Sequence, residues 1–148
     1  METLELAGKG LSVASGIVIA KLLEVNAVLT NLNLAGNELN AEAGKAIAEA
    51  LKSGTAVLKS IDLRGNSLGT EGWCAIFAAL RDNKENTIEA WDLSYEGISS
   101  EVAKVLAEYV SLSKVLKSLN VADNELGNVG ERALRDAANG RDGCELML

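Results

Sequence analysis

The stretch Leu32-Asn-Leu-Ala-Gly-Asn-Glu-Leu39 decides the fold, because four other segments of the chain repeat its pattern. These segments are Leu4-Glu-Leu-Ala-Gly-Lys-Gly-Leu11, Ile61-Asp-Leu-Arg-Gly-Asn-Ser-Leu68, Trp91-Asp-Leu-Ser-Tyr-Glu-Gly-Ile98 and Leu119-Asn-Val-Ala-Asp-Asn-Glu-Leu126. Their starts lie 28, 29, 30 and 28 residues apart, and a sixth start, Leu146, follows 27 residues later. The alternation of apolar residues predicts a strand with one buried face in each segment.

Apolar residues recur at helical spacing after each strand. In the second repeat they are Ala43, Ile47, Ala50 and Leu51, which fall on one face of a helix of about three turns. A strand and a helix of this size cannot bury their own apolar faces, so the copies must stack. Strands pack about 4.8 Å apart and helices are about 10 Å wide, so the stack must curve with the sheet inside.

The predicted fold class is therefore an α/β solenoid, a horseshoe arc with a parallel sheet on the concave side and helices on the convex side. We expect a single domain over 1–148, with five strand–helix repeats and a terminal strand. The predicted boundaries are 1–28, 29–57, 58–87, 88–115 and 116–142 for the repeats, and 143–148 for the strand.

The pattern L-x-x-L-x-L-x-x-N-x-L followed by a helix resembles the leucine-rich repeats of ribonuclease inhibitor. The same subclass occurs in NOD-like receptors, the Ran GTPase-activating protein and tropomodulin. The resemblance extends over essentially the whole chain, and it implies a binding scaffold without identifying the ligand.

The resemblance also implies a role for one asparagine per repeat, whose amide bonds to the backbone of neighbouring turns. Asn37, Asn66 and Asn124 match this position, whereas Lys9 and Glu96 replace the asparagine in the first and fourth repeats. An ionised glutamate only accepts hydrogen bonds. Either Glu96 turns outward, or the turn of the fourth repeat is looser than the others.

Composition excludes several classes of function. The chain has no histidine, its two cysteines are seventy residues apart, and no phosphate-binding glycine motif is present. We therefore expect no enzyme, no catalytic residues, no metal and no cofactor. A net charge of −7 disfavours nucleic acid, and no apolar run could span a membrane. These features predict a cytoplasmic protein with free thiols.

The concave face is the predicted binding surface, because alternate strand residues point away from the helices. Their acidic side chains outnumber the basic one, which favours a protein partner with a basic segment. The candidate residues are Glu5, Asn31, Asn33, Ser60, Asp62, Arg64, Asp92, Ser94, Ser118, Asn120 and Glu145.

Two further features of the sequence leave alternatives open. Trp73 and Phe77 lie four residues apart on the third helix, and either fill a gap between the third and fourth helices or form a convex anchor for a partner. The first repeat has no capping sequence and an apolar helix, with Ile17, Val18 and Leu22. Its outer side either contacts a second copy or a larger protein, or is a tolerated short edge.

The function predicted from the sequence is a protein–protein interaction scaffold that binds through the concave sheet. The alternative is a regulator of a small GTPase or of actin, by analogy with the Ran activator and tropomodulin.

Overall fold

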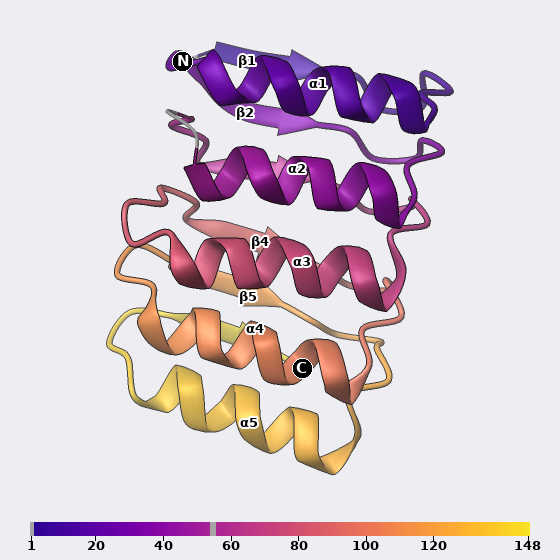
Figure 1. The fold of residues 1–148 in the computed structure, drawn as a ribbon. Helices are drawn as coiled ribbons and strands as arrows, with labels where there is room; N and C mark the ends of the chain where they lie inside the picture. Colours follow the sequence, from indigo (N-terminus) through magenta and orange to yellow (C-terminus); the bar gives the residue numbers. More distant parts are fainter. Residues whose placement is uncertain (1, 54–55) are drawn as a thin grey trace.

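The computed structural model describes residues 2–53 and 56–148 as a row of alternating strands and helices (Figure 1). The strands are β1 (Glu2–Glu5), β2 (Leu29–Asn33), β3 (Ser60–Asp62), β4 (Ala90–Asp92), β5 (Ser118–Asn120) and β6 (Glu145–Met147). The helices are α1 (Val13–Val25), α2 (Ala41–Ser53), α3 (Gly69–Asp82), α4 (Ser100–Leu112) and α5 (Gly127–Asn139). Residue 1 of the first predicted repeat and residues 54–55 of the second lie outside the described residues.

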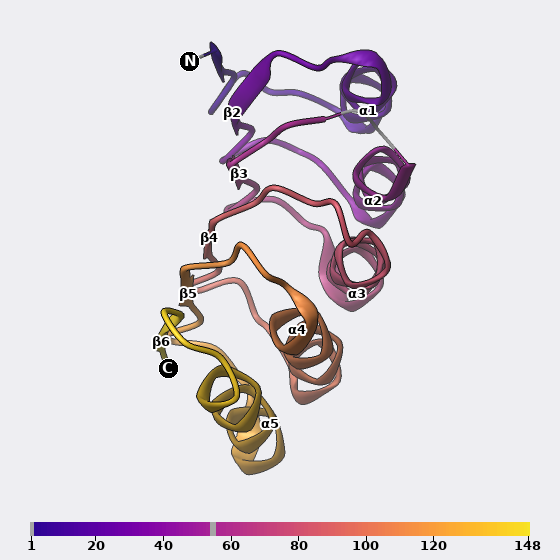
Figure 2. The ribbon, with the colours of Figure 1, turned by 90° about the vertical axis from the view of Figure 1, so that its left-hand side faces the viewer.

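We number the five strand–helix units along the chain from unit 1 (β1 and α1) to unit 5 (β5 and α5). The strands form one parallel sheet in the order β1-β2-β3-β4-β5-β6. Figure 2 shows the helices as the outer, convex row and the strands as the inner row of the arc. The α/β repeat arrangement predicted from the sequence is confirmed, whereas the residue boundaries of the repeats remain a prediction.

An aliphatic core fills the space between the sheet and the helices. In unit 2, Leu32, Leu34 and Leu39 are 0–2% exposed, and Ile47 from the helix is completely buried. Apolar residues at the alternate strand positions therefore face the helix, as the period of two requires. Adjacent helices approach closely at glycines: a Cβ on Gly44 would lie 3.1 Å from the Cα of Gly72.

The repeated asparagines connect neighbouring turns. The Asn37 carboxamide accepts hydrogen bonds from the N–H groups of Lys9 and Leu11, both at 3.0 Å, and donates to the carbonyls of Leu6 and Leu34, both at 2.9 Å. Asn66 and Asn124 make equivalent bonds to their own turns and to the preceding unit. Asn37 is buried, whereas Asn66 and Asn124 are half-buried.

Units 3 and 4 meet at a junction with fewer backbone hydrogen bonds than the other junctions. The strand register here is reduced to the single pair Ser60–Ala90. At the other junctions, the first N–H after a strand donates to the carbonyl of the last residue of the next strand. Examples are the bonds from Leu34 to Asp62 and from Leu93 to Asn120, both at 2.8 Å. Among the described residues, no equivalent bond joins Leu63 to β4. We call this junction the seam.

Glu96 explains part of the seam, because it occupies the asparagine position of unit 4. Its carboxylate accepts a hydrogen bond from the N–H of Gly65 at 2.8 Å. In the preceding unit pair, the corresponding N–H of Gly36 donates to the carbonyl of Arg64. The glutamate thus replaces a backbone contact, and of the two alternatives the structure shows the looser turn.

Four aromatic side chains pack at the seam. Trp73 and Phe77 are stacked with ring centroids 5.6 Å apart, and both meet the Trp91 ring edge-on at 6.2 and 5.3 Å. Phe77 also stacks on Tyr109 of α4 at 6.1 Å. Ring packing therefore joins units 3 and 4 where part of the backbone ladder is missing.

Candidate functional site

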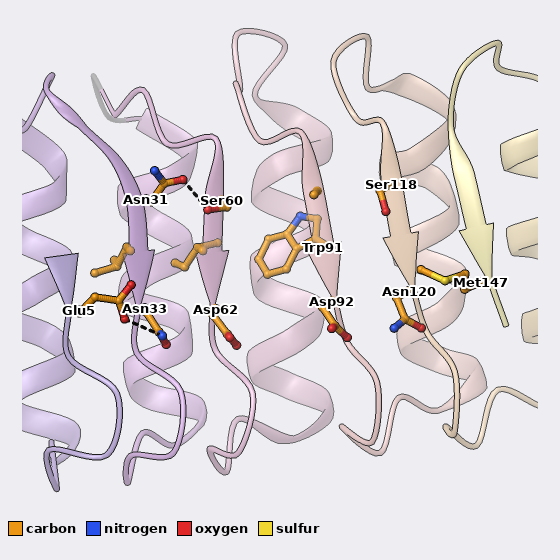
Figure 3. Close-up of a pocket in the computed structure, with 13 residues that line it drawn as sticks. Glu5, Asn31, Asn33, Ser60, Asp62, Trp91, Asp92, Ser118, Asn120 and Met147 are labelled. Atoms are coloured by element: carbon orange, nitrogen blue, oxygen red, sulfur yellow. Dashed lines mark hydrogen bonds between the residues drawn. The ribbon is translucent and has the colours of Figure 1, made fainter. Parts of the chain in front are cut away.

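The concave side of the sheet contains a hollow of about 380 Å³, with lining residues from all six strands (Figure 3). Polar side chains alternate with the edges of apolar core residues along its floor. The lining residues are Glu5, Asn31, Leu32, Asn33, Ser60, Ile61, Asp62, Ala90, Trp91, Asp92, Ser118, Asn120 and Met147. We refer to these thirteen residues as the concave hollow.

Most of the residues predicted from the sequence meet in this hollow. Eight of the eleven candidates line it, and they come from β1 to β5. Arg64, Ser94 and Glu145 do not line it. The first two follow the ends of β3 and β4, and Glu145 begins the edge strand β6. Their use in binding remains a prediction, as it does for the other eight.

Sequence reasoning left Met147 and Ala90 out of the candidate list, although both line the hollow. Met147 is 49% exposed and adds a flexible apolar side chain at the β6 end. The alternation of strand residues predicts that both side chains lie on the concave face. They were left out because only polar residues were chosen as candidates.

The last residue of β2, β3, β4 and β5 has a structural role in addition to its exposure. The side-chain oxygens of Asn33, Asp62, Asp92 and Asn120 each accept a hydrogen bond from the N–H two residues later, at 3.0–3.1 Å. This Asx geometry turns the chain from the strand toward the helix. Asparagine or aspartate at this position is therefore required by the turn, and only the remaining polar atoms are available to a partner.

A guanidinium bridges the two acidic strand ends. Arg64 binds Asp62 with Nε and Nη2, at 3.0 and 2.8 Å, and reaches across the seam to Asp92 with Nη1 at 3.0 Å. The hydrogen bond with Asp62 raises the pKa of Arg64 above its usual value. Burial opposes ionisation of Asp92, but hydrogen bonds from Ser94 and the attraction of Arg64 outweigh it and lower the pKa of that carboxyl.

The acidic charge of this region still exceeds the basic charge. Glu5, Asp62, Asp92 and Glu96 provide four carboxyl groups against the single guanidinium of Arg64. Glu5 accepts a hydrogen bond from Asn33 at 2.8 Å, with no basic side chain bonded to it among the described residues. Burial raises the pKa of Glu96. Acidic groups thus outnumber basic groups in this region of the described structure.

Tyr95 is an exposed aromatic residue that the sequence analysis did not single out. It is 76% exposed and directly follows Ser94, whose hydroxyl donates to Asp92 at 2.7 Å. Its φ is 59°, a left-handed conformation that costs a non-glycine residue roughly 1–2 kcal/mol. Units 2 and 3 have glycine here, Gly36 and Gly65. Unit 5 has Asp123 here, with a φ of 58°, so this turn also accepts residues other than glycine. The signal that could have identified Tyr95 was a large aromatic residue at a turn position that is otherwise small or polar.

The proposed convex anchor is wrong. Trp73 is 2% exposed and Phe77 is completely buried, because both rings fill the space toward Trp91 and Tyr109. The packed alternative is the one that the structure shows. A partner on the convex side could not reach these rings without opening the core.

Among the described residues, Cys, Asp and Glu side chains form no group of three or more that could hold a metal ion. In the same part of the chain, no helix is long and apolar enough to cross a membrane.

Comparisons with known proteins agree with this architecture. The family model described as Leucine Rich repeat matches residues 25–48 and 113–134, and each match contains one strand and part of the following helix. A sequence search among curated proteins gives no significant match. The fold is similar to the solved structure titled "Leiomodin-1 Actin-Binding Site 2 (ABS2)", with a TM-score of 0.72 and 17% sequence identity, over 95% of this chain and 80% of that one. The chain thus has the fold of a leucine-rich-repeat domain, and two of its repeats match the family model itself.

Proposed function

We propose that this domain is a non-enzymatic scaffold that binds a protein through its concave surface, and that the partner presents a basic segment. The observation that carries this proposal is the concave hollow itself, because all six strands contribute to one continuous surface. At about 4.8 Å per strand, this surface extends over roughly 24 Å. That length suits an extended segment or a helix better than a small molecule.

Charge supports the basic character of the partner. The carboxylates Glu5, Asp62 and Asp92 lie on the hollow, and Arg64 neutralises only part of their charge. Because these groups are partly exposed to water, each ion pair with a partner contributes about 0–1 kcal/mol. We therefore expect the acidic residues to govern the association rate and its salt dependence more than the final affinity.

Tyr95 is the proposed aromatic contact at the rim of this surface. An exposed tyrosine provides a large contact area with few rotatable bonds, and such residues are frequent at the energetic centre of interfaces. The left-handed backbone at this residue reduces folding stability. A glycine would remove that cost. Unit 5 carries the same cost at Asp123, so the argument for Tyr95 depends on its exposed ring and not on its backbone.

The test is affinity capture from cell extract with quantitative mass spectrometry, using variants that keep the fold. Asp62→Asn with Asp92→Asn removes two charges and retains the Asx turns, since Asn33 and Asn120 already make them in neighbouring units. Proteins captured by the wild type should be depleted several-fold, with the loss greatest at low salt. The matched convex control, Glu42→Gln with Glu49→Gln on α2, should leave capture unchanged.

Tyr95→Gly provides an independent test. It should weaken capture while the midpoint of urea unfolding rises or stays constant, because the strained residue is removed. Capture that is unaffected by the concave double variant and by Tyr95→Gly, or that depends on the α2 control, would overturn the proposal.

A second candidate function is actin binding. It is favoured by the similarity in fold to the leiomodin actin-binding structure. The sequence identity between the two chains is low enough that the comparison shows a shared fold and no shared function. Co-sedimentation with filamentous actin and a pyrene-actin polymerisation assay test it directly. Actin binding would be supported if the protein pellets with filaments or alters polymerisation, and if the Asp62→Asn and Asp92→Asn double variant reduces that effect. It would be rejected if 50 µM protein has no effect in either assay. The GTPase-regulator alternative remains a prediction.

We also propose that the protein is cytoplasmic. The two cysteines, Cys74 and Cys144, are free thiols in the structure, which suits a reducing compartment. Localisation of a tagged chain by fluorescence microscopy tests this part of the proposal.

A further inference from the structure

The outer side of unit 1 exposes apolar residues that the other units cover. Leu22 of α1 is 61% exposed, whereas Ala50 and Ala79, at the same position of α2 and α3, are 0% and 5% exposed. Leu4 is 40% exposed, against 2% for its counterpart Leu32. In units 2 and 3, the preceding unit covers these positions.

These residues surround a second hollow, of about 400 Å³, between β1 and α1. Its apolar lining includes Leu4, Ile19, Leu22 and Val25, the last of which is 79% exposed. Val18 is 59% exposed and lies on the same face of α1, since residues 18, 22 and 25 are spaced i, i+4 and i+7. Helix α1 is therefore apolar on nearly all sides, a property typical of helices that are covered by another element.

β1 presents an unpaired edge beside this hollow. Among the described residues it pairs only with β2. The N–H of Leu6 donates to Asn33, and in a parallel strand the backbone groups alternate in direction. Those of Thr3 and Glu5 consequently point outward, where a further strand could bind.

We propose that two copies of this chain form a symmetric dimer through the outer side of unit 1, with β1 antiparallel to β1 of the second copy and α1 against α1. A two-fold axis at Leu4 places Thr3 opposite Glu5 of the other copy, so their outward N–H and carbonyl groups can pair. This register also keeps the two Glu5 carboxylates from lying directly opposite each other, an arrangement that would destabilise a strand pair.

The helices satisfy the same symmetry. The exposed residues Val18, Leu22 and Val25 are centred close to Leu22, so an antiparallel copy brings Val18 of one helix near Val25 of the other. Apolar surface then meets apolar surface on both sides of the axis, as an isologous interface requires.

The opposite end of the solenoid does not fit this face. The outer side of α5 carries Glu131 and Arg135, an exposed ion pair at 3.9 Å, together with the exposed Asp136. Stacking this helix on α1 would bury charged groups against valine and leucine without a partner. The chemistry thus favours contact between two copies of unit 1 over head-to-tail stacking.

The area is sufficient for a weak dimer. A 13-residue helix is about 20 Å long, and the unit is about 20 Å deep from sheet to outer helix surface. Two such faces bury roughly 800–1,000 Å² in total, at the low end for specific interfaces. We expect a dissociation constant of roughly 10–100 µM. Of the residues that line the concave hollow, only Glu5 takes part in this interface.

Sedimentation equilibrium of the full chain from 1 to 300 µM tests the dimer. The expected mass rises from the 15.5 kDa of one chain to twice that value. Leu22→Glu should raise the dissociation constant at least tenfold, because it places a charge in the apolar dimer interface. The matched control is Val129→Glu: Val129 is also 61% exposed but lies on α5, so dimerisation should be unchanged.

A cross-link tests the register. With Cys74 and Cys144 replaced by serine, Leu4→Cys should form a disulfide between two copies under mild oxidation, since residues on the axis have Cβ atoms about 4.5–5.5 Å apart. Val129→Cys in the same background should not. If circular dichroism shows that Leu22→Glu does not fold, Val18→Glu replaces it.

Three results would overturn the proposal. One is a monomer at 300 µM. Another is a dimer that neither Leu22→Glu nor Val18→Glu weakens. The third is an assembly that grows beyond two copies and is sensitive to Val129→Glu, which would show head-to-tail stacking.

Discussion

Asn37→Ala should be among the most destabilising single substitutions of a polar residue in this protein, because the carboxamide satisfies backbone groups of two units. Truncation leaves the N–H groups of Lys9 and Leu11 and the carbonyl of Leu6 without the partners that they have now. The carbonyl of Leu34 keeps a bond from the next asparagine. Three lost partners at about 1 kcal/mol each predict a decrease of about 3 kcal/mol in the free energy of unfolding.

The same count of lost hydrogen-bond partners predicts a smaller decrease in the free energy of unfolding for Asn66→Ala. Asn66→Ala leaves only the Leu39 N–H and the Leu63 carbonyl without partners, since Asn37 still donates to Leu34. The expected loss is about 2 kcal/mol. Urea unfolding followed by circular dichroism measures both values, provided that the m-value stays constant.

Two controls make the comparison specific. Asn128→Ala, at an exposed position of α5, should change stability by no more than about 0.5 kcal/mol. Asn37→Asp keeps a side-chain oxygen that can accept from the backbone N–H groups but removes the N–H donors of the carboxamide. It therefore tests how much the bonds to the backbone carbonyls contribute. Equal losses at Asn37 and Asn66, or a loss at Asn37 below 1 kcal/mol, would refute the reasoning from orphaned backbone groups.

Two other predictions concern the seam. In a Trp91→Phe background, the fluorescence of Trp73 should resist acrylamide until the protein unfolds, because the indole is 2% exposed; efficient quenching of the folded protein would contradict its placement. Burial raises the pKa of Glu96 above the ordinary 4.5, so the folded state binds the proton more tightly than the unfolded state. The wild type should therefore lose stability relative to Glu96→Gln as pH rises from 4.5 through the raised pKa, and a pH-independent difference between the two in urea midpoints would count against this.

The regular parts of the fold follow from local patterns in the sequence. Alternation at Leu32 and Leu34 and helical spacing at Ala43 and Ile47 each depend on one segment. The six copies of the pattern, spaced 27–30 residues apart, then determine the stacking. The concave candidates also follow from this alternation, because a strand residue that faces the helix cannot face the hollow.

Other features could not be predicted because they depend on contacts between units. Whether Trp73 is exposed depends on the space between α3 and α4, which its own spacing does not define. The seam likewise depends on how Glu96 meets the turn of unit 3. The dual role of Asp62 and Asp92 went unnoticed because the exposed position suggested only binding, and not the turn that follows the strand.

The seam also affects how the solenoid folds. In an array of this type, stability is roughly the sum of unit terms and nearest-neighbour interface terms, so cooperativity extends only as far as the interfaces are strong. Units 1 to 3 are linked by continuous hydrogen-bonded turns, whereas unit 3 meets unit 4 mainly through ring packing and exposed ion pairs such as Arg81–Glu108. The array therefore has an internal boundary, and its first three units and last two units are the natural blocks of partial unfolding.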